Sequence, residues 1–95
     1  MTTIYKGELK KGDQLIFKEV EISLQTINIG GRIERSGQLF IPNGQKLRID
    51  TLDPSFDFCG KDGSLFTIYI EKRNASYSQH GSSETFYIRA IPSMN

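Results

Sequence analysis

The chain has 95 residues, enough for one domain but not for two. Hydrophobic residues make up 37% of it and charged residues 24%, a composition typical of a globular protein rather than a disordered or fibrous one. Twelve basic residues nearly balance eleven acidic ones and leave a net charge of +1. This balance excludes strong electrostatic steering and disfavours general nucleic-acid binding, which depends on several concentrated cationic contacts.

The dominant hydrophobic period is two residues, and glycine turns interrupt it at short intervals. This pattern is typical of antiparallel strands joined by hairpins. We therefore expect an all-β fold: a single small antiparallel β barrel or sandwich of about seven or eight short strands, spanning residues 1–95.

The first expected strand carries Ile4, Tyr5 and Leu9 and ends in a turn at residues 10–13. The long run 14–29 follows. Its apolar residues change face twice, after Phe17 and again after Leu24, and each change predicts a bulge or corner.

The same run permits a second interpretation. Ile16, Val20, Leu24 and Ile27 also match one stripe of a helix near 14–27, which would make the fold α+β. We prefer the strand because the segment 20–25 alternates regularly and is rich in β-branched residues.

Further along the chain, Gly30-Gly31 predicts a tight hairpin, and Ser36-Gly37 predicts a second turn. The strongest hairpin signal is the turn 42–45 between the expected strands 38–41 and 47–51. A short strand around Phe56 and Phe58 then precedes a turn at residues 60–63.

Two further strands are expected, both with regular alternation of apolar and polar residues. The strand 64–72 places Phe66, Ile68 and Ile70 on one face, and the strand 84–91 does the same with Phe86, Ile88 and Ala90. The residues between them, 73–83, are polar and are expected to form a long loop that carries Tyr77 and His80. A loop of this length makes these two residues candidates for binding.

The residues available for chemistry are few. One cysteine and one histidine cannot supply the ligands of a transition-metal site, and the aspartates between residues 50 and 62 do not have the spacing of a calcium loop. Cys59 and His80 could form a nucleophile and base, but a lone cysteine in a β domain is more often an apolar filler. We expect no catalytic residue, metal or cofactor.

The side chains opposite the core are more informative. Tyr69 on one strand and Tyr87 and Arg89 on the other would share a sheet face if the strands are antiparallel neighbours. Aromatic and basic side chains together suit stacking and polar recognition, although tyrosines also pair across strands simply because their rings pack well. Tyr69, Tyr87 and Arg89, with Tyr77 and His80, are the candidate binding residues.

These features favour a non-enzymatic interaction or structural module that meets another protein or a second copy of itself, because the edges of a small sheet must be closed, covered or paired. The alternative is a weak single-strand nucleic-acid binder resembling OB or SH3-like barrels. A single cysteine and the absence of a secretory or membrane-spanning apolar run lead us to expect a cytoplasmic protein without membrane contact.

Overall fold

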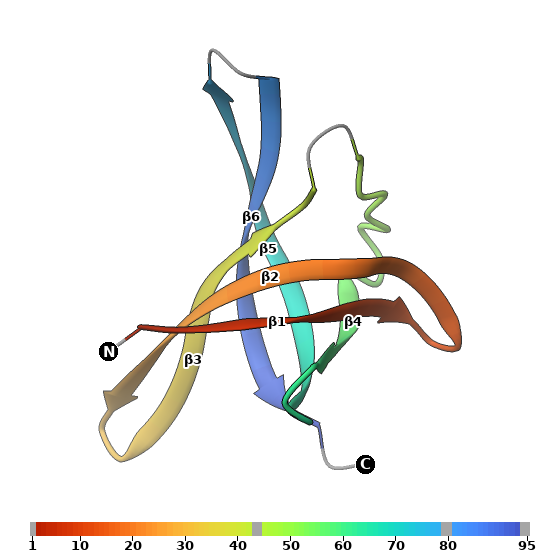
Figure 1. Cartoon of the computed structure of the whole chain (residues 1–95). Helices are drawn as coiled ribbons and strands as arrows, with labels where there is room; N and C mark the ends of the chain where they lie inside the picture. Colours follow the sequence, from red (N-terminus) through yellow and green to blue (C-terminus); the bar gives the residue numbers. More distant parts are fainter. Residues whose placement is uncertain (1, 43–44, 79–80, 94–95) are drawn as a thin grey trace.

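The structure is a computed structural model that describes residues 2–42, 45–78 and 81–93. Its six strands form a closed antiparallel barrel in the order β1-β2-β3-β6-β5-β4 (Figure 1). In chain order the strands are β1 (Thr2–Lys11), β2 (Gln14–Ile29), β3 (Arg32–Phe40), β4 (Ser55–Gly60), β5 (Leu65–Ser78) and β6 (Gly81–Pro92). The expected all-β class is confirmed, and of the two expected architectures the chain adopts the barrel.

The run that also matched a helical stripe, 14–27, lies within a single strand, β2. Its first part pairs with β1 and its second part with β3, so the backbone hydrogen bonds that a helix would have formed locally are formed between strands. The helical alternative is therefore wrong. The expected bulge after Phe17 is confirmed by register shifts in the β1–β2 ladder between Gly7 and Lys10. The second expected bulge, after Leu24, is wrong, because the β2–β3 register runs without a shift through Ile27.

Two other expectations, a turn and a loop, are wrong for a common reason: pairing with neighbouring strands keeps turn-forming residues extended. Ser36 and Gly37 lie within β3 and pair with both β2 and β6. Residues 73–78 and 81–83, expected to be loop, extend β5 and β6 as paired strands. The strand expected at 47–51 is irregular, and Leu47 is buried in the core without belonging to a ladder. Six strands, of which all but β4 are at least nine residues long, thus replace the expected seven or eight short ones.

The interior of the barrel is filled by the alternating apolar side chains. Every inward residue predicted on the last two strands contacts the core, with Ile70 at its margin. The interior is packed rather than hollow, as small barrels require. The buried hydrophobic residues are Leu9, Val20, Ile22, Leu24, Leu39, Ile41, Leu47, Phe56, Phe58, Phe66, Ile68, Phe86, Ile88 and Ala90.

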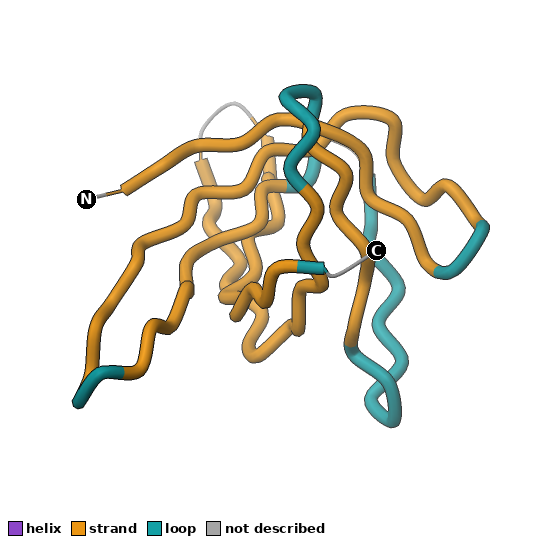
Figure 2. Tube along the Cα trace, turned by 90° about the horizontal axis from the view of Figure 1, so that it is seen from below, coloured by secondary structure: helices purple, strands orange, loops and turns teal. Residues whose placement is uncertain are grey.

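Two hairpins extend beyond the barrel wall, one formed by β2 and β3 and the other by β5 and β6 (Figures 1 and 2). The β2–β3 hairpin turns at Gly30 and Gly31, whose φ angles of 58° and 83° lie in the left-handed region that a two-residue turn requires. These projections account for the elongated dimensions of 42 × 29 × 29 Å.

Candidate binding surfaces

Tyr69, Tyr87 and Arg89 lie together on the outer face of the barrel, as their alternation predicts. Tyr69 pairs with Arg89 in the β5–β6 ladder, and the Arg89 guanidinium carbon lies 5.6 Å from the centroid of the Tyr69 ring. Tyr87 is two residues from Arg89 on the same strand and is 40% exposed. This arrangement is a cation–π contact beside an accessible aromatic side chain.

Glu71 of β5 adds an acidic side chain to this face. The register shifts between Ile70 and Lys72, so Glu71 has no direct partner on β6. Its carboxylate Oε1 lies 3.9 Å from Nε of Arg89, and both side chains are more than half exposed. Strand alternation already puts position 71 on the outer face with Tyr69, so the bulge removes Glu71 from the ladder and leaves its negative charge next to Arg89.

A groove of about 440 Å³ lies on the same outer face and crosses several strands. We call it the outer groove. Its lining is rich in hydroxyl and amide groups and includes Ser23, Gln25, Ser36, Gln38, Glu71 and Tyr87. Of the predicted binding residues, Tyr87 lines the groove, while Tyr69 and Arg89 lie at its side.

The end of the β2–β3 hairpin forms a second surface, which we call the arm (residues 26–34). The last pairs that tie the hairpin to the barrel are Gln25 with Thr2 of β1 and Arg35 with Ala90 of β6. Beyond these pairs, no other strand among the described residues flanks the arm. Ile29 and Ile33 are each 59% exposed, and Ile27 is 37% exposed.

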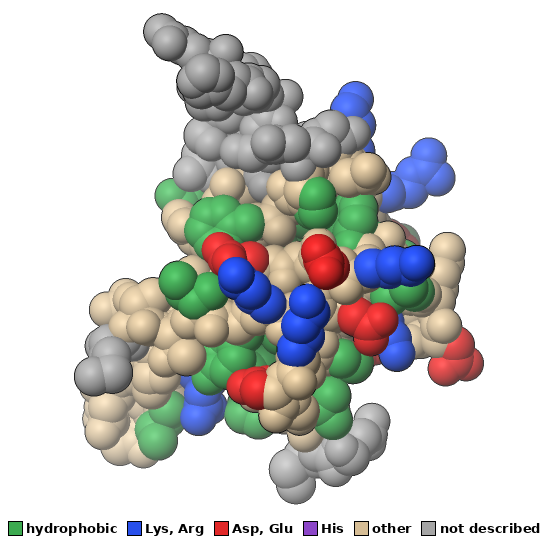
Figure 3. Space-filling view, viewed as in Figure 1, with side chains coloured by type: hydrophobic (Ala, Val, Ile, Leu, Met, Phe, Trp, Pro, Cys, Tyr) green, Lys and Arg blue, Asp and Glu red, His purple; other side chains and the backbone are tan. Residues whose placement is uncertain are grey.

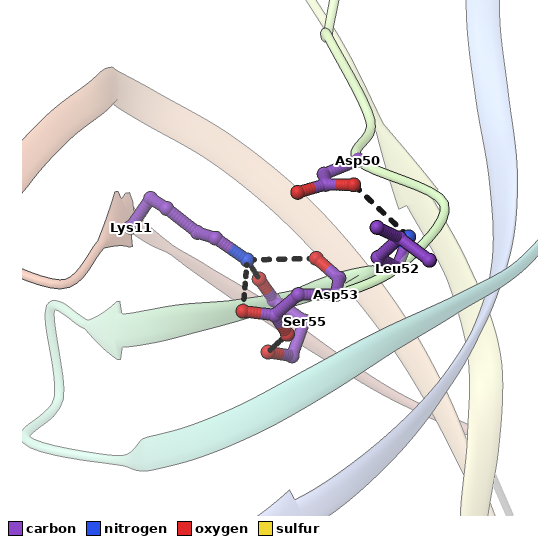
Figure 4. A network of polar contacts seen from close by, with 5 residues as sticks. All are labelled: Lys11, Asp50, Leu52, Asp53 and Ser55. Atoms are coloured by element: carbon purple, nitrogen blue, oxygen red, sulfur yellow. Dashed lines mark hydrogen bonds and ion pairs between the residues drawn. The ribbon is translucent and has the colours of Figure 1, made fainter.

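The loop before β4 is fastened to the end of β1 by Lys11 (Figure 4). The Lys11 ammonium donates hydrogen bonds to the carbonyls of Asp53, at 2.8 Å, and Ser55, at 2.5 Å, and lies 3.2 Å from the Asp53 carboxylate. A hydrogen bond from the Ser55 hydroxyl, at 2.6 Å, together with Lys11, lowers the pKa of Asp53. These contacts hold the loop against the end of β1, so we assign the network no catalytic or binding role.

The remaining residues considered for chemistry are not brought together. Cys59 is partly buried in β4. Tyr77 lies in β5 with its main chain opposite Ser82, whereas His80 lies outside the described residues. Among the residues that the structure describes, no group of three or more histidine, cysteine or carboxylate side chains is arranged to hold a metal ion.

Sequence reasoning missed the arm. The sequence pattern predicts a bulge where the apolar residues change face at Ile27 and Ile29, and not an exposed hairpin. One feature of the sequence does indicate the arm. Ile27 and Ile29 lie on the outward face of β2, whereas Val20, Ile22 and Leu24 lie on the inward face. Apolar residues on the phase that faces solvent indicate a surface that is covered by something else.

Charged side chains of both signs are mixed over the face shown in Figure 3, as the near-zero net charge predicts. Two ion pairs between exposed side chains are Lys6 with Glu21 and Lys61 with Glu19. The described part of the chain contains no helix long and apolar enough to cross a membrane.

Comparison with protein-family models, with curated proteins and with solved structures found no match.

Proposed function

We propose that this protein is a non-enzymatic interaction module that associates with a second copy of itself through the arm. The observation that carries the proposal is the exposure of apolar side chains on both faces of a two-stranded segment without flanking strands in the described structure: Ile33 is on one face, and Ile27 and Ile29 are on the other. A two-stranded hairpin is only marginally stable in water, and its open edges are a template for pairing with another strand. Association would bury apolar surface and complete the main-chain hydrogen bonding of the arm.

The edge of β3 is complementary to itself. Around the two-residue turn, Ile29 pairs with Arg32, so the main-chain groups of the next residue, Ile33, point to the opposite, open edge. An antiparallel pairing of two copies about a two-fold axis at Ile33 places the two Ile33 residues opposite each other. It also places Arg32 of each copy opposite Glu34 of the other.

This charge pattern is the reason for choosing a second copy as the partner. Arg32 and Glu34 are on the same face of β3, since they are two residues apart, and Ile33 is on the other face. Closed two-fold symmetry needs one patch that complements itself. The sequence Arg-Ile-Glu satisfies that need, with two cross-strand ion pairs on one face and an isoleucine pair on the other.

The test is sedimentation velocity up to millimolar concentration, with a charge-swap series. We expect a concentration-dependent dimer in the parent protein. Arg32→Glu opposes like charges at two places in the dimer and should weaken it about tenfold. The double variant Arg32→Glu/Glu34→Arg should restore it. Arg48→Glu, at an exposed position outside the arm, is the matched control and should dimerise like the parent.

Two results would overturn the proposal. One is a parent protein that remains monomeric throughout the concentration range. The other is a double variant that dimerises no better than Arg32→Glu, which would mean that the two charges do not meet across the interface. Thermal unfolding of each variant at low concentration verifies that the fold is unchanged.

The second candidate, single-strand nucleic-acid binding, is supported by one observation: Arg89 and Tyr69 stack beside an exposed Tyr87. Glu71 opposes it, because a carboxylate 3.9 Å from the arginine would face an incoming phosphate. The geometry therefore favours the interaction module, and an oligonucleotide is included as a probe in the next experiment.

A further inference from the structure

We infer that the outer groove is a binding site for a neutral, hydroxyl-rich ligand of the saccharide class. The site is separate from the arm, so the inference does not depend on self-association. It rests on four features: the arrangement of the polar side chains, their chemistry, their charge and the exposed carboxylate of Glu71.

The polar side chains form two ordered rows across the strands. In the first row, Ser23 of β2 pairs with Gln38 of β3, which pairs with Tyr87 of β6. In the second row, Gln25 pairs with Ser36, which pairs with Arg89. Long and short polar residues thus alternate both along each strand and across it. The short serines leave room between the longer side chains, and the groove of about 440 Å³ falls within the usual range of small-molecule sites.

The chemistry of the rows suits hydroxyl groups. A glutamine amide offers two donors and an acceptor oxygen, and a serine hydroxyl donates and accepts, so Gln25, Gln38, Ser23 and Ser36 can bond to a sugar hydroxyl in either direction. Tyr87 adds a partly exposed ring, whose flat apolar face can pack against the carbon-bound hydrogens of a sugar ring.

The charge of the groove lining favours a neutral ligand over an anionic one. The one ionised side chain in the groove lining is Glu71, which forms an ion pair with Arg89. The adjoining outward positions on β1 and β2, Lys6 and Glu21, form a charged pair. The uncharged rows therefore stand out on a surface that is otherwise rich in charge. An anion would meet the Glu71 carboxylate at close range, whereas a neutral hydroxyl can donate to it in a charge-assisted hydrogen bond.

Glu71 is the residue of β5 that a bulge leaves out of the β5–β6 ladder. In a regular strand Glu71 would pair directly with Tyr87 on the same outer face, since Ile70 pairs with Ile88. The bulge therefore changes the pairing of Glu71 but leaves its carboxylate in the groove lining, where it is more than half exposed and can accept a hydrogen bond from a ligand hydroxyl.

The experiment is an amide chemical-shift titration of the full chain. The neutral probes are maltoheptaose, cellohexaose, chitohexaose and mannohexaose, the acidic probe is a hyaluronan oligosaccharide, and the nucleic-acid probe is oligo-dT. We expect at least one neutral probe to shift the amides of Ser36, Gln38 and Tyr87 at millimolar concentration. Neither the acidic probe nor oligo-dT should shift them.

Two groove variants and one control complete the design. Gln38→Ala and Gln25→Ala each remove one hydrogen-bonding amide and should weaken binding of the active probe about tenfold. Gln14→Ala removes an exposed amide at the far end of β2 and should leave binding unchanged. A dispersed amide spectrum verifies the fold of each variant.

Several outcomes would overturn the inference. If no neutral probe shifts the groove amides, the site does not bind this ligand class. Stronger groove shifts with hyaluronan or oligo-dT would assign it to an anionic ligand, and in the case of oligo-dT would revive the nucleic-acid candidate. A neutral probe whose affinity is unaffected by both Gln38→Ala and Gln25→Ala binds elsewhere. None of these results bears on dimerisation through the arm.

Discussion

Arg89 lies directly across the β5–β6 ladder from Tyr69, with its guanidinium carbon 5.6 Å from the centre of the tyrosine ring. The pair lies on the outer face of a barrel whose interior is filled, so it contributes to the surface without being part of the core. Its neighbour Glu71 partly neutralises Arg89 and lies in the lining of the outer groove.

The Tyr69–Arg89 contact should be measurable as a coupling energy. We expect a double-mutant cycle of Tyr69→Ala and Arg89→Ala, followed by urea unfolding, to give a coupling of about 0.5–1 kcal/mol, the usual value for an exposed cation–π pair. The control cycle combines Tyr69→Ala with Lys18→Ala, an exposed position in the part of β2 that pairs with β1, and should be additive. Additive effects for both cycles would mean that the contact does not stabilise the fold.

Gly37 is predicted to be nearly intolerant of substitution. A Cβ atom at this position would come within 1.7 Å of the carbonyl oxygen of Ser23 on β2, which is backbone and cannot rotate away. Gly37→Ala therefore requires the β2–β3 ladder to shift, and we expect a loss of about 3 kcal/mol or more in the free energy of unfolding. Ser36→Ala, at the exposed face next to it, should cost less than about 1 kcal/mol. Equal effects of the two substitutions in denaturant melts would contradict the close approach.

The titration of Asp53 should depend on Lys11. The pKa of Asp53 lies below its ordinary value because of the Ser55 hydroxyl first and the Lys11 ammonium second. A carboxyl with a lowered pKa stabilises the fold above its ordinary pKa, and that contribution is lost as the pH falls through the lowered value. In Lys11→Met the pKa of Asp53 should rise toward its ordinary value, so the contribution should be smaller and its loss should be complete at a higher pH than in the parent.

Carboxyl-carbon NMR shifts recorded against pH would measure this change. Asp62 is the internal control: its pKa is also lowered, but by the backbone N–H and then the hydroxyl of Ser64, so Lys11→Met should leave it unchanged. An unchanged Asp53 titration in the variant would show that Lys11 does not hold this carboxylate in solution.

The core and the loop before β4 should respond very differently to the loss of a large apolar side chain. Phe58 is fully buried, and Phe58→Ala should destabilise the protein by about 3–5 kcal/mol through lost burial and the cavity left behind. Leu52 is 94% exposed, and Leu52→Ala should change stability by no more than about 0.5 kcal/mol. Thermal and urea unfolding of the two variants would test the contrast. Similar losses would place Leu52 in a buried contact.

The candidate sites show which neighbours the local sequence pattern predicts and which it does not. Alternation predicts that Tyr69, Tyr87 and Arg89 share a face, because neighbouring antiparallel strands keep inward and outward positions in phase. It does not predict that Ser36 and Gln38 stand beside Tyr87, since that requires β3 to pair with β6, which is distant in sequence. The groove is therefore assembled from strand neighbours that no local pattern reveals.

The sequence by itself determined the all-β class, the inward residues of β5 and β6, and the turns at Gly12, Gly30-Gly31 and Gly63. These depend on the intrinsic period of a strand and on backbone angles that favour glycine, both of which are local properties. The tertiary structure decided which ambiguous segments became strand. Ser36-Gly37 and the run 73–78 are extended because pairing with neighbouring strands stabilises them more than local turn preference opposes them. The same long-range pairing ends before the tip of the arm, and so leaves Ile29 and Ile33 exposed.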